Sequence, residues 1–195
     1  MKIILASASP RRKILLEQLG LDFIIKPSEI DETKFNLNNP IKLVQKLSYL
    51  KADDVYSSKE EIVIAADTVV SKDDLVLGKP ADKDEARKML KSLSNTTHEV
   101  ISGITIIAGG EVRTSYERTN VTFKKLTNQE IDDYIATGEP LDKAGAYGIQ
   151  AKGAVLVKKI DGCFYNVVGL SLYRVVEMMK ELGWEIELNG LLSYN

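Results

Sequence analysis

Short apolar runs typical of buried strands alternate along this chain with segments of helical periodicity. Residues 2–6 form the first apolar run, a helical stripe over residues 10–19 follows and closes at Gly20, and residues 62–66 form a second run. An alternation of strands and helices builds a sheet that is covered by helices. The order of the segments therefore predicts an α/β fold.

The later segments continue the alternation. Asn39-Pro40 is a good helix start, so a helix is expected from Pro40 toward Val55. The other expected elements are a hairpin over residues 68–77, a helix over 82–93, antiparallel strands over 100–107 and 112–123, a helix from Thr127 to Gly138, strands 154–160 and 163–168 joined by a turn at Asp161-Gly162, and a helix over 171–182. The sequence shows no internal repeat or linker, so residues 1–195 are expected to form one domain.

Composition excludes several classes of protein. The 26 basic and 28 acidic residues give a net charge of −2, whereas proteins that bind duplex nucleic acid carry a basic excess. Cys163 is the only cysteine and His98 the only histidine, so an internal disulfide and a cysteine- or histidine-rich zinc site are excluded. No apolar run is long enough to cross a bilayer and the first residues do not resemble a signal peptide, so we expect a soluble cytoplasmic protein without membrane contact.

The segment from Ser7 to Arg12 is the most informative stretch. Ser9 is a good N-cap and Pro10 suits the first helical position, which places Arg11 and Arg12 in the first turn. The start of a helix already carries partial positive charge and favours acids. Two arginines fit there if backbone N–H groups, serine hydroxyls and guanidinium groups bind an anion together. The alternative is an exposed helix start with solubilising arginines. A Walker A loop is absent from the sequence.

Asp67 directly follows the apolar run of residues 62–66. The expected hairpin returns the chain to Lys79, which should bring this lysine close to Asp67. The pair is either a structural salt bridge or an acid–base site with a phosphate-binding lysine. A carboxylate in such a place can activate water or bind Mg²⁺. Glu32 offers further negative charge for a metal, although a solvated loop acid is the simpler interpretation.

Taken in order, a set of segments that spans nearly the whole chain resembles the Maf family of nucleotide pyrophosphatases. The matching residues are Ser7-Ala8-Ser9-Pro10-Arg11-Arg12, Lys51-Ala52, Ala66-Asp67-Thr68-Val69-Val70, Gly78-Lys79-Pro80, His98-Glu99-Val100, Ser102-Gly103, Gly138-Glu139-Pro140, residues 142–150 and Tyr165-Asn166-Val167-Val168-Gly169-Leu170. Each segment alone is a weak signal, but the ordered set is specific.

The resemblance implies an elongated, twisted mixed β-sheet flanked by helices, with two lobes around a cleft, as in Maf and ITPase-like proteins. It implies cleavage of a nucleoside triphosphate between the α and β phosphates, with Asp67 as the proton acceptor. We expect Mg²⁺ or Mn²⁺ as the cofactor, with Glu32 and Asp67 as its candidate ligands. The resemblance is also compatible with a homodimer. The residues that it places around the substrate are Ser7, Arg11, Arg12, Lys51, Thr68, Lys79 and Gln150. The expected helix start adds Ser9 to this set.

Gln150 resembles the branch of the family that prefers dTTP and UTP, whereas the methylated-guanine branch tends to carry glutamate there. A primary amide offers both a donor and an acceptor, which complement the carbonyl and N3–H edge of uracil or thymine. Ala151 stands where glycine is usual in the family. The implied role is the cleaning of nucleotide pools, with a possible link to cell-division arrest. The alternatives are a non-catalytic nucleotide-binding regulator of septum formation and a pyrophosphatase of the 7-methyl-GTP branch.

Three further residues have ordinary interpretations. A lone histidine between a helix and a strand is more often a hydrogen-bonded structural group than a catalyst, so His98 is given no catalytic role. Tyr147 and Tyr165 are expected to pack in the core rather than stack on a base.

Overall fold

A computed structural model describes residues 1–35, 39–187 and 192–194 of the chain. Its centre is a mixed sheet in the order β2-β1-β3-β5-β6-β7, with β4 paired to β3. Strand β1 is parallel to β2 and β3, and the other pairs are antiparallel. The strands are β1 Lys2–Leu5, β2 Phe23–Ile25, β3 Glu61–Lys72, β4 Leu75–Leu77, β5 Thr97–Ala108, β6 Glu111–Phe123 and β7 Val157–Asp161, and a separate hairpin joins β8 Trp184–Ile186 to β9 Leu192–Tyr194.

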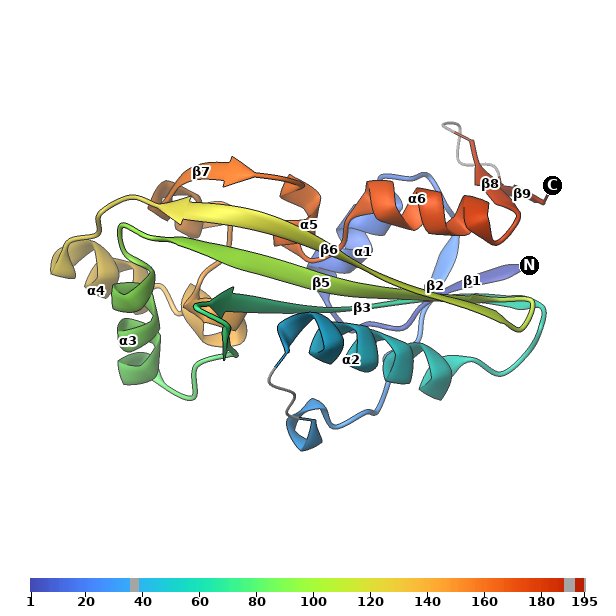
Figure 1. Ribbon diagram of the computed structural model, residues 1–195, viewed down its shortest axis with the longest axis horizontal. Coiled ribbons are helices and arrows are strands. Elements are labelled where there is room, and N and C mark those ends of the chain that lie inside the picture. Colours follow the sequence, from blue (N-terminus) through green and yellow to red (C-terminus); the bar gives the residue numbers. More distant parts are fainter. Residues whose placement is uncertain (36–38, 188–191, 195) are drawn as a thin grey trace.

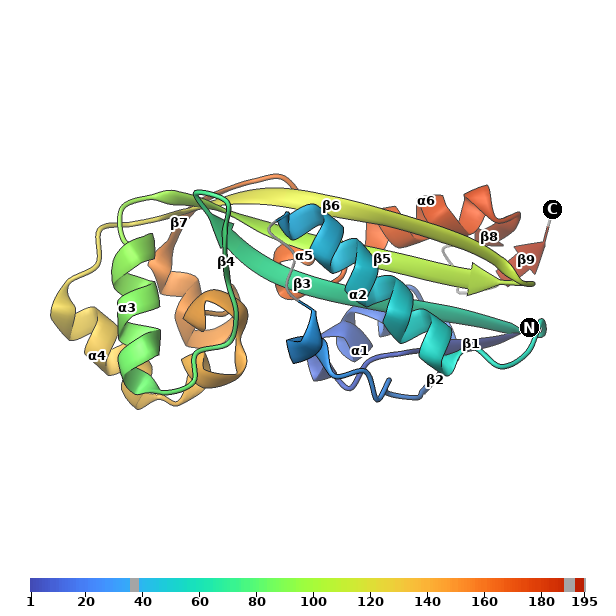
Figure 2. The same ribbon diagram turned by 60° about the horizontal axis from the view of Figure 1, so that its bottom comes forward.

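Helices cover both faces of this sheet, which confirms the α/β fold with a mixed sheet (Figure 1). Helix α2 lies on one face, while α1, α5 and α6 lie on the opposite face, and α3 and α4 lie at the far end (Figures 1 and 2). The helices are α1 Pro10–Glu17, α2 Pro40–Val55, α3 Lys83–Leu93, α4 Asn128–Ala136, α5 Phe164–Val168 and α6 Leu172–Glu181, with 3₁₀ turns η1 Glu32–Lys34, η2 Glu139–Asp142, η3 Ala144–Ala146 and η4 Ala151–Leu156. Within the described ranges no helix is both long and apolar enough to cross a membrane.

The long strands β3, β5 and β6 run through both ends of an elongated molecule (Figure 2). At one end the buried side chains of the sheet pack against α1 and α6 on one face and against α2 on the other. At the opposite end a separate apolar cluster joins the sheet to α3, α4 and η3. The molecule thus has two lobes that share the same three strands, as the resemblance implied.

Strand β3 determines which face each site residue occupies. Successive side chains of a strand point to opposite faces. Ile64 and Ala66 belong to the cluster on the α1 face, whereas Val63 and Ala65 pack under α2. The same alternation directs Asp67 toward α2 and Thr68 toward α1. Asp67 lies in the middle of a strand that extends to Lys72, so the prediction that the strand ends before Asp67 was wrong.

One edge of β3 is covered in two separate stretches. Strand β1 pairs with Glu61 to Ile64, and β4 pairs with Val70 to Lys72. Among the described strands, none pairs with residues 65–69 along this edge. Asp67 and Thr68 therefore lie where the edge of the sheet is open between β1 and β4.

The predicted strand over residues 163–168 was wrong. The expected strand over residues 154–160 is present only from Val157 as β7, and it pairs with β6 instead of a following strand, because the chain then forms helix α5. The reason is Asn166, which this helix buries completely and which donates to Val100 O at 3.0 Å and to Thr119 Oγ1 at 2.9 Å. Thr119 Oγ1 also accepts the backbone N–H of Cys163 at 3.1 Å. A short apolar run does not distinguish a strand from a buried helical turn.

His98 is a buried structural residue in the second lobe, which is the lobe of α3 and α4. Its exposed fraction is 2%, and its ring packs edge-on against Phe123 and Tyr147. The ring nitrogen Nε2 lies 2.7 Å from the hydroxyl oxygen of Tyr147. Burial lowers the pKa of His98 to about 4, and the charge of Lys72 acts in the same direction. The folded protein therefore holds this histidine neutral.

This neutral histidine predicts a loss of stability in mild acid. Below about pH 6.5 the unfolded chain binds a proton on His98 that the folded protein does not accept until about pH 4. We expect the free energy of unfolding to fall by about 2 kcal/mol between pH 7.5 and pH 5, as measured by urea denaturation. Because His98 is the only histidine, the variant His98→Gln should lack this slope while keeping a polar partner for Tyr147. An equal slope in the variant would contradict the assignment.

Candidate active site

A cavity of about 620 Å³ opens at the uncovered edge of β3 and takes side chains from both lobes. Its volume lies within the usual range for small-molecule sites. Every side chain that the sequence predicted for substrate or metal lines this one cavity. They are Ser7, Ser9, Arg11, Arg12, Glu32, Lys51, Asp67, Thr68, Lys79 and Gln150. The structure thus brings together residues that lie up to 143 positions apart in the sequence, as from Ser7 to Gln150.

A buried ion-pair cluster occupies the α2 side of the cavity. Lys51 projects from α2, and its Nζ lies 2.6 Å from Asp67 Oδ1 and 2.7 Å from Glu32 Oε1. The side chains of Lys51 and Asp67 are only 9% and 7% exposed, whereas that of Glu32 is 49% exposed. Partial burial acts to raise the pKa of Glu32, but the hydrogen bond and charge of Lys51 outweigh it and hold the pKa below its usual value.

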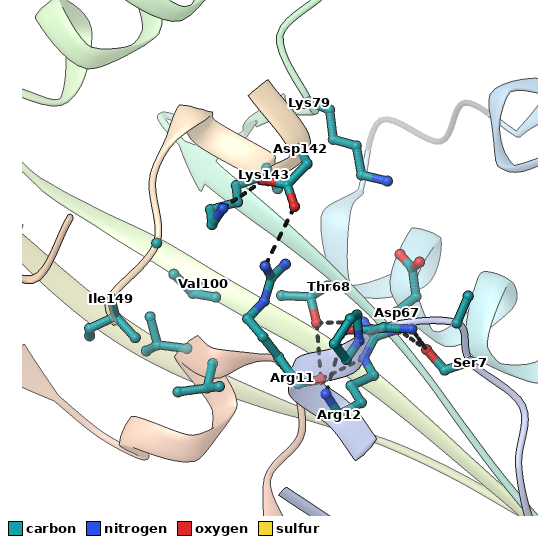
Figure 3. A pocket seen from close by; sticks show the side chains of 18 of the residues that line it. Ser7, Arg11, Arg12, Asp67, Thr68, Lys79, Val100, Asp142, Lys143 and Ile149 are labelled. Carbon is teal, nitrogen blue, oxygen red and sulfur yellow. Dashed lines mark hydrogen bonds and ion pairs between the residues drawn. The ribbon is translucent and has the colours of Figure 1, made fainter. Parts of the chain in front are cut away.

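The expected contact between Asp67 and Lys79 is replaced by this cluster. Lys79 lines the same cavity, but in the described part of the chain the ion-pair partner of Asp67 is Lys51. Lys79 is exposed and follows β4, and Figure 3 shows it reaching the cavity from the side of Asp142. Its charge still contributes to the lowered pKa of Glu32.

On the α1 face of β3, opposite the ion-pair cluster, Arg12 connects α1 to three other segments. Its Nε donates to Gly169 O at 2.8 Å, its Nη2 to Thr68 Oγ1 at 3.0 Å and its Nη1 to Ser7 Oγ at 3.3 Å. Burial lowers the pKa of Arg12, while the charges of Asp67 and Glu32 oppose this shift. The guanidinium is thus fixed in place before any ligand arrives.

The start of α1 has the geometry that the sequence predicted. Ser9 is the N-cap and its side chain accepts the backbone N–H of Arg12 at 3.5 Å, with Pro10 in the first position. The first turn carries no acid. Backbone N–H groups, Ser7 and two arginines therefore face the cavity at a helix end that favours anions.

Arg11 spans the cleft between the lobes. Its Nη1 lies 3.8 Å from Asp142 Oδ2, and the other oxygen of that carboxylate accepts from Lys143 Nζ at 2.6 Å. Figure 3 shows Arg11 extending from α1 toward Asp142 and Lys143 on the opposite wall. Partial burial acts to raise the pKa of Asp142, but Lys143 and Arg11 together hold it below its usual value.

The wall away from the charged cluster is apolar. Val70, Val100, Ile149 and Val167 line it, and Gln150 is exposed at its margin. A cavity with a cationic end and an apolar end suits a ligand that combines anionic groups with a flat ring.

Some lining residues were not singled out from the sequence. Glu139 lines the cavity from η2, and Val100 lines it from β5. Glu139 stands between a glycine and a proline, which marks a turn but no chemistry. Tyr147 packs in the core as expected, at 5% exposed, although it also contributes to the cavity wall. The prediction that Tyr165 is a core residue was wrong, since it is 42% exposed.

The sequence suggests only two metal ligands, Asp67 and Glu32. Among the described residues, no group of three or more His, Cys, Asp and Glu side chains is arranged to hold a metal ion. Asp67 and Glu32 nevertheless direct one oxygen each at a common position, now taken by the ammonium of Lys51. Mg²⁺ is commonly held by one or two carboxylates together with phosphate oxygens and water. These two residues fit that incomplete type of site.

Comparisons with known proteins place this chain in a family. The family model described as Maf-like protein matches residues 2–182. Two curated proteins named dTTP/UTP pyrophosphatase, from Bacillus anthracis (strain CDC 684 / NRRL 3495) and Bacillus cereus (strain B4264), are 49% and 48% identical over 186 residues, which cover 95% of this chain and 97% of each relative. The solved structure of a HAM1 protein from Coxiella burnetii has a TM-score of 0.52 at 14% identity, and the match covers 93% of this chain and 99% of that chain. At this identity the likeness concerns the fold alone.

The buried cluster predicts a strong coupling between Lys51 and Asp67. Removing one partner of a buried pair leaves an uncompensated charge, which typically costs about 3–5 kcal/mol. We expect Lys51→Met to lower the free energy of unfolding by this amount at pH 7, and Lys51→Met combined with Asp67→Asn to recover more than half of it. Urea denaturation of the two single variants and the double variant gives the coupling energy.

Lys42→Met, on the exposed side of the same helix, is the matched control and should stay within about 0.5 kcal/mol of the unchanged protein. Additive effects of Lys51→Met and Asp67→Asn would show that the two side chains do not interact in solution.

Proposed function

This chain belongs to the Maf family, and we propose that it hydrolyses dTTP and UTP to the monophosphate and pyrophosphate. The observation that carries the proposal is the single cavity in which all of the sequence-predicted site residues meet. Two relatives that are 49% and 48% identical carry the name of this activity. We further propose that residues 1–195 act as one domain, because the cavity needs side chains from both lobes. We also propose a cytoplasmic location.

The charge distribution supports one orientation of the substrate. The triphosphate would lie over the start of α1, where Ser7, Arg11 and Arg12 converge and Lys79 reaches in from the other lobe. The ring would lie against the apolar wall, with Gln150 beside its polar edge. In this orientation Arg11 exchanges its 3.8 Å contact with the carboxylate of Asp142 for hydrogen bonds to phosphate oxygens, which a guanidinium can bind in a bidentate way.

Asp67 would act as the general base. One carboxylate oxygen is held by Lys51 at 2.6 Å, which orients the group and leaves the other oxygen for a water molecule. The water oxygen attacks the α phosphorus and its proton passes to Asp67. The bond from the α phosphorus to the bridging oxygen breaks, and pyrophosphate leaves with that oxygen. Arg11, Arg12 and Lys79 offset the charge that develops on the leaving group.

A divalent cation, Mg²⁺ or Mn²⁺, is part of this proposal. Glu32 and Asp67 would hold it, since both point at one position beside the phosphate end of the cavity. When bound, it would neutralise charge on the phosphate oxygens and polarise them.

The experiment that tests this function is pyrophosphate release from dTTP, UTP, CTP, ATP, GTP and 7-methyl-GTP with Mg²⁺ or Mn²⁺. We expect dTTP and UTP to be cleaved best. Asp67→Asn should lower kcat by about 10²- to 10⁴-fold, the usual contribution of a general base.

Asp133→Asn, on the exposed face of α4, is the matched control and should retain full activity. Turnover of the folded Asp67→Asn protein at nearly the normal rate would remove Asp67 from this role. Binding of nucleotides without any turnover would favour the non-catalytic regulator, and preferred cleavage of 7-methyl-GTP would favour the other branch.

Gln150 is proposed to read the pyrimidine edge. Replacing it with glutamate keeps the size but removes the donor, and the lost hydrogen bond should lower kcat/KM for UTP about tenfold. We expect Gln150→Glu to change the ratio of kcat/KM for UTP and GTP, measured by pyrophosphate release. Gln129→Glu, on α4, is the control. An unaltered substrate ranking would exclude base reading by this side chain.

A further inference from the structure

The segment from Gly148 to Gly153 carries Gln150 at the apolar end of the cavity, and its two ends are held by two side chains of the second lobe. Tyr134 lies on α4 and Glu139 begins η2. Neither residue belongs to the charged cluster around Asp67. We propose that Glu139 and Tyr134 are positioning residues that fix this loop and thereby set the preference for a pyrimidine ring.

The carboxylate of Glu139 accepts hydrogen bonds from one end of the loop. Its Oε1 accepts the backbone N–H of Gly153 at 3.2 Å, and its Oε2 accepts the backbone N–H of Lys152 at 3.3 Å. Its Oε1 also accepts from the hydroxyl of Tyr134 at 3.0 Å. An ionised carboxylate is an acceptor only, so three donors around one such group form a matched set.

Tyr134 connects the carboxylate to the other end of the loop. Its hydroxyl donates to Glu139 and accepts the backbone N–H of Gly148 at 3.1 Å. The side chain is 4% exposed, and burial raises the pKa of Tyr134, so the hydroxyl keeps its proton. One phenol and one carboxylate therefore bind the loop at both of its ends.

The two ends of the loop are also packed directly together. A Cβ atom at Gly153 would lie 2.1 Å from Gly148 O and 2.6 Å from the hydroxyl of Tyr134, so only glycine fits there. At Gly148 a Cβ atom would lie 2.9 Å from the Lys143 side chain, whose Nζ donates to Glu139 O at 2.7 Å. The loop thus closes on itself around Tyr134 and Glu139, with no room for a side chain at Gly153.

The middle of the loop is strained and faces the cavity. Ala151 has φ of +53°, a conformation that favours glycine and costs other residues free energy. Ile149, Gln150 and Ala151 all line the cavity. A strained loop keeps such a conformation only when its surroundings fix it, and here the fixed points are the hydrogen bonds at its two ends.

The consequence concerns selectivity rather than chemistry, and it rests on the proposed function. If the loop is released, Gln150 no longer meets the ring in one orientation, while Asp67 and Lys51 in the other lobe are untouched. Loss of binding that is shared by the ground state and the transition state raises KM and leaves kcat unchanged.

The test is Tyr134→Phe, which keeps the buried ring and removes only the hydroxyl. We expect KM for UTP to rise about tenfold at unchanged kcat. This is the factor that the loss of one hydrogen bond of ordinary strength produces, here the bond between Gln150 and the ring. The preference for UTP over GTP should fall by the same factor. Amide hydrogen exchange, measured without nucleotide, should become faster at Gly148 and Gly153. Glu139→Gln should act in the same direction, because its amide nitrogen cannot accept a backbone N–H.

Thr127→Ala is the matched control for a merely structural effect. Thr127 caps α4, the helix that carries Tyr134, through a capping box with Glu130. Its removal should destabilise the helix as much as Tyr134→Phe does, but without a change in the ratio of UTP to GTP turnover or in exchange at the loop ends.

Each outcome of the experiment has one meaning. Unchanged selectivity in Tyr134→Phe, or an equal loss in Thr127→Ala, overturns the positioning role. Absence of turnover in the unaltered protein overturns the proposed function instead. The positioning role is then decided by the dissociation constants for UTP and GTP, measured by calorimetry on the unaltered protein and on Tyr134→Phe: a tenfold loss for UTP alone supports it, and equal effects on both nucleotides overturn it.

Discussion

The open edge of β3 between β1 and β4 is the feature on which the site depends. Hydrogen bonds from neighbouring strands cover the edge on either side of residues 65–69. A covered edge would place another strand where the cavity lies. Because the side chains of a strand alternate, the opening exposes Asp67 on the α2 face and Thr68 on the α1 face to the same space. Two helices on opposite sides of the sheet can then contribute to one site.

Charge is arranged within this opening so that a chain of net charge −2 can attract an anion. Five cationic and four anionic side chains line the cavity, and the carboxylates of Asp67, Glu32 and Asp142 each contact a lysine or an arginine. These contacts hold the cations in place. They add little net stability, because the desolvation of a buried ion pair offsets most of its attraction. An incoming triphosphate can therefore take over cations that are already positioned, instead of ordering flexible side chains.

Local chemistry made part of this site predictable. Ser9, Pro10 and the two arginines follow from the rules for helix starts and anion binding, and each lies where those rules place it. The partner of Asp67 was not predictable in this way, because Lys51 reaches it from a separate helix through tertiary packing. Helix α5 was missed for a related reason, since its conformation depends on the distant acceptors of Asn166. Without the fold, only the family resemblance connects such separated positions.

The two lobes divide the work of recognition between them. Asp67, Lys51 and the start of α1 belong to the lobe built around α2 and α6. The loop that carries Gln150 is held at both ends by Tyr134 and Glu139 of the other lobe. Strands β3 and β5 run through both lobes with ten registered residue pairs, which makes the connection between them stiff. A stiff connection fixes the distance from the phosphate end to the ring end of the cavity. A nucleotide whose α phosphate lies at Asp67 can therefore reach Gln150 only if its ring has a suitable size. Selectivity then depends on the fixed position of the loop as much as on the side chain of Gln150.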